Sequence, residues 1–129
     1  MKKILVIIAL LGVINRGFAV GIDDFTVVSK ERAGTLEEKH LIKTLEDSKG
    51  RQLTTTYREK SMSIHFNEGF TAGEKLKYKE EIIEELIEIG MAVTGSETIF
   101  LRTHVKLEGE NKKIEVVSDL DNNILIIEG

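Results

Sequence analysis

Residues 71–93 read TAGEKLKYKEEIIEELIEIGMAV, and this stretch decides the fold. At about 100° per residue, most of its large apolar side chains fall on one half of a helical cylinder. Five of its six glutamates fall on the other half. Thr71 and Glu74 stand three apart, which is the spacing of a capping box at a helix start. The stretch therefore predicts one long amphipathic helix, whose apolar half must lie on another layer of structure.

The segments on both sides of this helix alternate between apolar and polar residues, as half-buried strands do. Before the helix, we expect strands over residues 25–30, 52–58 and 61–67. After it, we expect strands over residues 98–107, 113–118 and 124–127, of which 98–107 is the clearest. Turn-forming Gly, Asp and Asn residues join these last three segments and predict a three-stranded meander.

Residues 35–50 fit two different structures. Thr35 and Glu38 repeat the capping-box spacing, and Gly50 could follow the end of a helix. Residues 40–46 also alternate as a strand does, and the turn-forming sequence DSKG follows them. Periodicity alone does not decide between the two for so short an apolar run. We expect the strand.

The order of these elements predicts an α+β domain. Its antiparallel sheet should have about five to seven strands, with the long helix packed on one face and the three-stranded meander after it. The segment 124–127 is apolar on both faces, so we expect it to be central or covered. The chain contains no cysteine, so no disulfide can form and the domain depends on its core.

The N-terminus has the three parts of a secretory signal peptide. A pair of lysines stands near the start, residues 4–14 form an apolar run, and Gly17 and Ala19 place small residues before a cleavage position. The apolar run is too short to span a bilayer, which takes about 20 residues. A membrane anchor and a buried first element are the alternatives. We predict that residues 1–19 are a cleaved signal peptide and that residues 20–129 form a single domain, periplasmic or secreted.

Cleavage after Ala19 would remove three basic residues and no acidic one, which changes the formal net charge from −4 to −7. Binding to nucleic acid depends on clustered Lys and Arg side chains that contact phosphates. A negative protein is also repelled by anionic membrane surfaces. We therefore expect a partner other than nucleic acid, and no stable membrane span after cleavage.

No motif in the chain predicts a catalytic, metal or cofactor site. The three histidines show no metal-ligating spacing: His40, His65 and His104. Ser63 and His65 share a strand face, but their side chains would lie about 7 Å apart, too far for a direct hydrogen bond. Residues 119–123 begin like a calcium loop but lack the glycine at its sixth position and the later bidentate glutamate, so we expect a turn there.

The segment 98–107 carries the candidate binding residues, which alternation would place on one strand face: Phe100, Arg102, His104 and Lys106. In an acidic chain, an aromatic ring with three potentially cationic groups forms a local basic stripe. If that face of the sheet is open, the stripe could receive an acidic ligand or partner. Otherwise it is the ordinary polar face of a one-sided sheet.

These observations predict an exported, non-enzymatic binding or interaction module whose partner is an unknown protein or an acidic ligand. Two alternatives remain open. A small hydrolase or ligand-binding enzyme could assemble its site in space from His65, His104 and carboxylates. A structural subunit could pair with another chain through residues 124–127, if that strand lay at a sheet edge.

Overall fold

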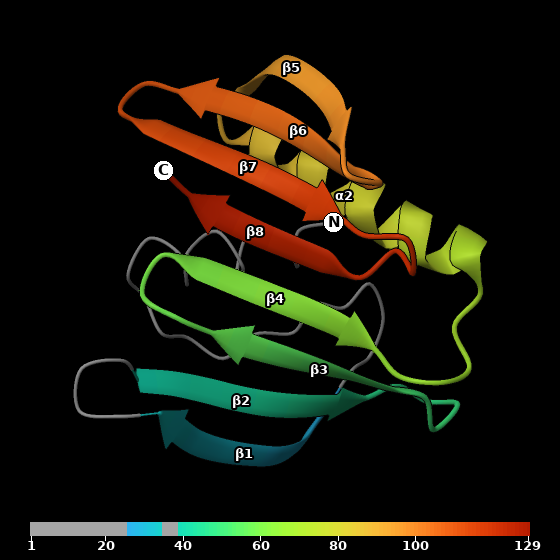
Figure 1. Ribbon diagram of the computed structural model, residues 1–129. Coiled ribbons are helices and arrows are strands. Elements are labelled where there is room, and N and C mark those ends of the chain that lie inside the picture. The colour runs from blue at the N-terminus through green and yellow to red at the C-terminus, as the bar shows by residue number, and fades with distance from the viewer. Residues whose placement is uncertain (1–25, 35–38) are drawn as a thin grey trace.

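A computed structural model describes residues 26–34 and 39–129 of the chain. The predicted signal peptide, residues 1–19, and the possible helix start at Thr35 lie outside the described residues. The described part forms one antiparallel sheet of eight strands in the order β1-β2-β3-β4-β8-β7-β6-β5, with one helix, α2, on one face (Figure 1).

The elements have the following bounds in chain order. The strands before the helix are β1 (Thr26–Gly34), β2 (Lys39–Glu46), β3 (Gln52–Tyr57) and β4 (Ser61–Phe66). The helix is α2 (Ala72–Glu88). The strands after it are β5 (Ala92–Ile99), β6 (Arg102–Gly109), β7 (Lys112–Ser118) and β8 (Ile124–Glu128).

The sheet consists of two four-stranded meanders that α2 connects. Strands β1 to β4 follow one another across one half of the sheet. The helix then carries the chain across one face to β5 at the far edge, and β6, β7 and β8 return towards the centre (Figure 1). The last strand therefore pairs with β4, so that Met62 lies opposite Ile126 and Ile64 opposite Ile124.

The core lies on the α2 side of the sheet. Alternation places Met62, Ile64 and Phe66 of β4 on this side, where all three are buried. Tyr78 on α2 meets the Phe66 ring edge-on, with the ring centroids 5.3 Å apart. The residues of the sheet's centre and the helix thus form one continuous apolar cluster, as the two-faced helix predicts.

The apolar stripe of α2 is narrower than the sequence suggests. Tyr78, Ile82 and Leu86 follow one another at spacings of four residues and are buried. Ile87 and Ile89, which we expected on the apolar half, are 47% and 43% exposed. Each step along a helix turns by about 100°, so a residue beside the buried line lies on the flank of the contact.

From the sequence we underestimated the number of strands in the sheet and in the meander after the helix. The sheet has eight strands, not five to seven, and the meander after the helix has four strands, not three. The cause is the segment 98–107, which is not one strand: it contains the end of β5 at Ile99, a two-residue turn, and β6 from Arg102 onwards. The two residues between them are apolar, so the sequence carries no turn signal there.

The end of the helix was also placed too late in the sequence. The helix ends at Glu88, with Ile89 as its C-cap, and Gly90 takes a φ of 103°. A positive φ after a helix is the role that glycine fills without strain. Residues 92 and 93, expected in the helix, begin β5, and Gly95 lies within that strand.

Other expectations are confirmed. Residues 40–46 lie in a strand, β2, and a turn with Gly50 at a φ of 79° follows it. The final strand β8 is central, with β4 on one side and β7 on the other. Both edges of β8 are therefore occupied, which leaves no free edge at residues 124–127 for strand addition.

The capping box at the start of α2 is confirmed and is tied to the sheet. The Thr71 hydroxyl accepts from the N–H of Glu74, and the Glu74 carboxylate accepts from the N–H of Thr71. Arg51, just after the β2–β3 turn, donates from Nη1 to both Glu74 oxygens at 2.8 and 2.9 Å. Arg51 also donates from Nε to Asp47 at 2.9 Å. These contacts attach the helix start to the turn.

We predict that Glu74→Gln destabilises the domain in a pH-dependent way. The pKa of Glu74 is lowered from 4.5 to about 2, first by the hydrogen bond from the Thr71 N–H and then by Arg51. Because the folded-state pKa is the lower one, this stabilisation is present above pH 4.5 and is lost as the pH falls towards about 2. Glu74 is 40% exposed, so we expect a loss of only about 1 kcal/mol at neutral pH.

Urea unfolding of the wild type and the variant at several pH values measures this difference. Glu84→Gln, an exposed position on the same helix, is the control and should change little. If Glu74→Gln lowered the free energy of unfolding by the same amount at neutral pH and near pH 2, the carboxylate charge would not be the source of the stabilisation.

Candidate functional site

The face of the sheet opposite α2 is covered by no described element, and we call it the open face (Figure 1). One row of cross-strand neighbours crosses it from β4 to β6: Ser63, Leu125, Val117 and His104. The two apolar residues are in the middle of this row and the polar residues at its ends. Along this row the open face is therefore apolar at Val117 and Leu125 and polar on either side.

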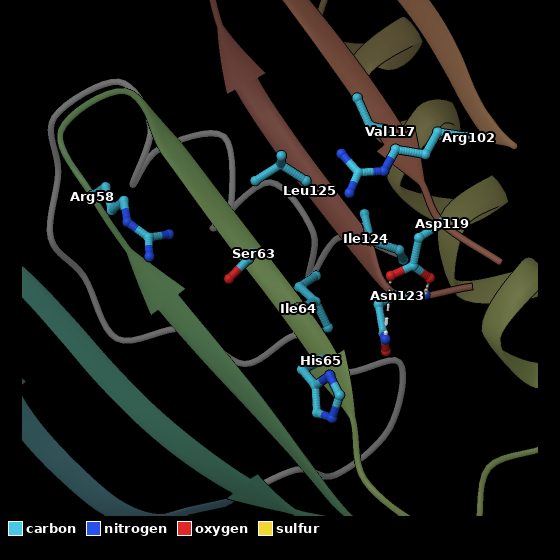
Figure 2. A pocket seen from close by; sticks show the side chains of 10 residues that line it. All are labelled: Arg58, Ser63, Ile64, His65, Arg102, Val117, Asp119, Asn123, Ile124 and Leu125. Atoms are coloured by element: carbon cyan, nitrogen blue, oxygen red, sulfur yellow. Dashed lines mark hydrogen bonds between the residues drawn. The ribbon is translucent and has the colours of Figure 1, made fainter. Parts of the chain in front are cut away.

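A basin of about 340 Å³ lies on the open face (Figure 2). Its lining includes Arg58, Ser63, His65, Arg102, Val117 and Leu125. These residues come from both meanders, so the basin exists only because β8 pairs with β4.

Two arginines stand on opposite sides of the basin. Arg58 follows β3, where its N–H donates to the carbonyl of Ser61 and closes the β3–β4 turn. Arg102 is the first residue of β6. Both side chains extend towards the centre of the basin (Figure 2). Among residues 26–34 and 39–129, no carboxylate forms a salt bridge with either guanidinium.

The floor of the basin is apolar and its β4 side is polar. Val117 is 4% exposed, and Leu125 beside it is half-buried. Ser63 and His65 lie along β4 on the open face, where Ser63 is half-buried and His65 is exposed. A ligand in the basin would thus meet aliphatic carbon below, a hydroxyl and an imidazole at one side, and a guanidinium at each end.

The corner of the basin between β7 and β8 is a hydrogen-bonded turn. Asp119 Oδ1 accepts from the N–H groups of Asp121 and Asn123, each at 2.9 Å. Asn123 Oδ1 accepts from the N–H of Phe66, which fixes the turn to β4. The prediction of a turn at residues 119–123 is confirmed, since the Asp119 carboxylate is used within the turn.

The predicted basic stripe is only partly basic. Arg102, His104 and Lys106 share the open face of β6, as alternation predicts. However, His104 Nδ1 lies 2.6 Å from Glu115 Oε2, and Lys106 Nζ lies 2.9 Å from Glu97 Oε1. The Glu97 carboxylate raises the pKa of Lys106, and Lys106 lowers the pKa of Glu97. Arg102 is the member of the stripe that lines the basin.

Phe100, the fourth residue of the predicted stripe, is not on that face. It occupies the two-residue turn between β5 and β6 together with Leu101, with φ values of 50° and 66°. The two side chains are 91% and 67% exposed. The prediction that Phe100 aligns with Arg102 was wrong, because a turn between them ends the alternation.

The three histidines lie on three different strands. His40 is on β2, while His65 on β4 and His104 on β6 are three strand spacings apart, a separation of roughly 15 Å. The structure therefore does not bring His65 and His104 together into one site. Within the described residues, no group of three His, Cys, Asp or Glu side chains lies close enough to hold a metal ion.

Sequence reasoning missed Arg58 and the apolar floor. Arg58 stands at the end of an alternating segment, where nothing in the local pattern distinguishes it from a solvated turn residue. Leu125 appeared as one member of a strand that is apolar on both faces, and Val117 was not singled out within the segment 113–118. A signal for the floor did exist, because an apolar residue on the polar face of a strand marks a covered or binding surface.

Over the described residues, no helix combines the length and the apolar composition that crossing a membrane requires. No protein-family model, no curated protein and no solved structure matches the chain. Its function is therefore inferred from the geometry of the basin.

Proposed function

We propose that this protein is an exported, non-enzymatic binding module that holds an acidic ligand, or an acidic group of a protein partner, in the basin on its open face. The observation that carries the proposal is the pair of arginines, Arg58 and Arg102, on opposite sides of an apolar floor. Arginine stays charged at any physiological pH, and its planar group binds carboxylates through two parallel hydrogen bonds.

The surroundings of the basin support an acidic ligand over a basic one. The two guanidinium groups form no salt bridge within the described chain, whereas Lys106 and His104 nearby already face carboxylates. An incoming carboxylate would therefore meet two cations with which no carboxylate of residues 26–34 and 39–129 competes. The apolar floor adds area that an aliphatic part of the ligand can cover.

The binding proposal is tested with octanoate, which has one carboxylate and an aliphatic chain. We expect the methyl resonances of Val117 and Leu125 to shift during an NMR titration, and binding to weaken as salt screens the charges. Arg102→Gln should weaken binding by about fivefold, since an exposed ion pair contributes up to about 1 kcal/mol.

Lys106→Gln is the matched control, because it removes a cation from the same strand face outside the basin lining. Octanoate shifts that spread over the whole protein, or that Arg102→Gln leaves unchanged, would argue against the basin as an acid-binding site.

The export proposal rests on the N-terminal pattern of two lysines, an apolar run and small residues before position 20. Expression of the full chain in a bacterial host should yield a mature protein that begins at Val20 in the periplasm or the medium. Mass spectrometry of the purified protein measures its N-terminus. An intact N-terminus on protein retained in the cytosol would refute the export proposal.

A further inference from the structure

We infer that the ligand of the basin carries two anionic groups, one for each arginine, joined by an apolar segment that lies over Val117 and Leu125. This inference rests on the proposed function and narrows it from acids in general to extended diacids. It follows from the order of chemical groups across the basin.

The first step is the separation of the two cations. Arg58 follows β3 and Arg102 begins β6, and β4, β8 and β7 lie between these strands. Neighbouring strands are about 4.8 Å apart, so the two backbones are roughly 20 Å apart. The strand registers also offset the two residues along the sheet, because Arg58 lies beside Ser61, in the row of Lys106, four residues from Arg102. Both side chains extend inwards (Figure 2), but three strands still separate them, so a gap remains between the guanidinium groups. A single carboxylate cannot contact both groups across that gap.

The second step is what lies between the cations. The middle of the basin presents Leu125 and the nearly buried Val117, with the Ser63 hydroxyl beside Leu125 on β4. A charged ligand centre over these two aliphatic residues would lose water without gaining an ionic partner. The complementary ligand is therefore anionic at both ends and aliphatic in the middle.

The third step concerns the one carboxylate in the lining. Asp119 stands near the Arg102 side of the basin and would repel an anion if its charge faced the ligand (Figure 2). Its Oδ1 instead accepts hydrogen bonds from the backbone N–H groups of Asp121 and Asn123, and its Oδ2 accepts one from the Asn123 side-chain amide at 3.5 Å. Part of its charge is thus compensated within the turn, and Arg102 remains available.

The test compares linear dicarboxylates of increasing length with monocarboxylates of the same length. The dicarboxylates are succinate, adipate, suberate and sebacate, and the monocarboxylates are octanoate and decanoate. Dissociation constants come from the methyl shifts of Val117 and Leu125. We expect affinity to rise with length up to suberate or sebacate, and the best diacid to bind at least about fivefold tighter than its matched monoacid.

Variants separate the two ends of the basin. Arg58→Gln and Arg102→Gln should each reduce the affinity for the best diacid to that for the matched monoacid. Lys60→Gln and Lys106→Gln remove cations close to each end but outside the lining, and should leave the affinity unchanged. All four positions are exposed, so the fold should persist, and the methyl spectrum of each free variant checks it.

The outcomes distinguish this inference from the proposed function. If diacids and matched monoacids bind equally well, the inference is wrong while the basin remains an acid-binding site. If neither class shifts the basin methyls, both fail. A short peptide with two acidic side chains around an apolar residue is a second source of the same chemistry. Tighter binding of that peptide than of sebacate assigns the site to a segment of a protein partner, and the reverse order assigns it to a free diacid.

Discussion

Ile126→Lys is expected to unfold the domain. Ile126 is fully buried on the α2 side of β8, opposite Met62 of β4 and Val116 of β7. A lysine there would place an unpaired charge in the centre of the core, which costs several kcal/mol in addition to the lost apolar packing. A domain of this size is stable by only about 5–15 kcal/mol. Far-UV circular dichroism and thermal unfolding measure the outcome.

Ile127→Lys is the matched control on the neighbouring position. Ile127 points to the open face and is half-buried, and Glu115 lies opposite it on β7. We expect this variant to fold and to lose at most about 1 kcal/mol, because a cross-strand pair of opposite charges offsets part of the lost apolar contact. Ile126→Ala, at a cost of about 2–5 kcal/mol, gives a graded version of the same test. Equal effects of lysine at both positions would contradict the assigned faces of β8.

The double substitution Phe100→Asn with Leu101→Gly is expected to stabilise the domain. Both residues have positive φ in the two-residue turn between β5 and β6, a conformation that costs a non-glycine residue about 1–2 kcal/mol. Asn-Gly is the preferred pair for such a turn. The replaced side chains are largely exposed, so little packing is lost. We expect the free energy of unfolding to rise by about 1–2 kcal/mol, as measured by urea unfolding.

A control for this variant keeps the apolar side chains but exchanges them. Leu101→Phe with Phe100→Leu leaves the composition unchanged and keeps both residues non-glycine, so stability should stay within about 0.5 kcal/mol of the wild type. A loss of stability in the Asn-Gly variant would show instead that Phe100 and Leu101 stabilise the fold through contacts. Those contacts would then explain why Phe100 and Leu101 are apolar although they are exposed.

Local patterns sufficed to predict most of the elements but not their number. Residues 71–74 predicted the start of α2, because a capping box is a contact between neighbours in sequence. Gln52–Tyr57 and Ser61–Phe66 matched their expected strands because alternation reports burial of one face. The segment 98–107 was misread because Phe100 and Leu101 are not residues that favour a turn. Only the tertiary structure places a turn at these two positions.

The sequence by itself determined the class of this protein. A two-faced helix among alternating segments must pack on an antiparallel sheet, since its apolar half has no other surface to cover. The candidate site was decided only by the tertiary structure. Arg58 and Arg102 line the same basin because β8 returns to pair with β4, a contact between residues about 60 positions apart. Alternation along a strand fixes which face a side chain takes, but it does not report which strand lies beside it.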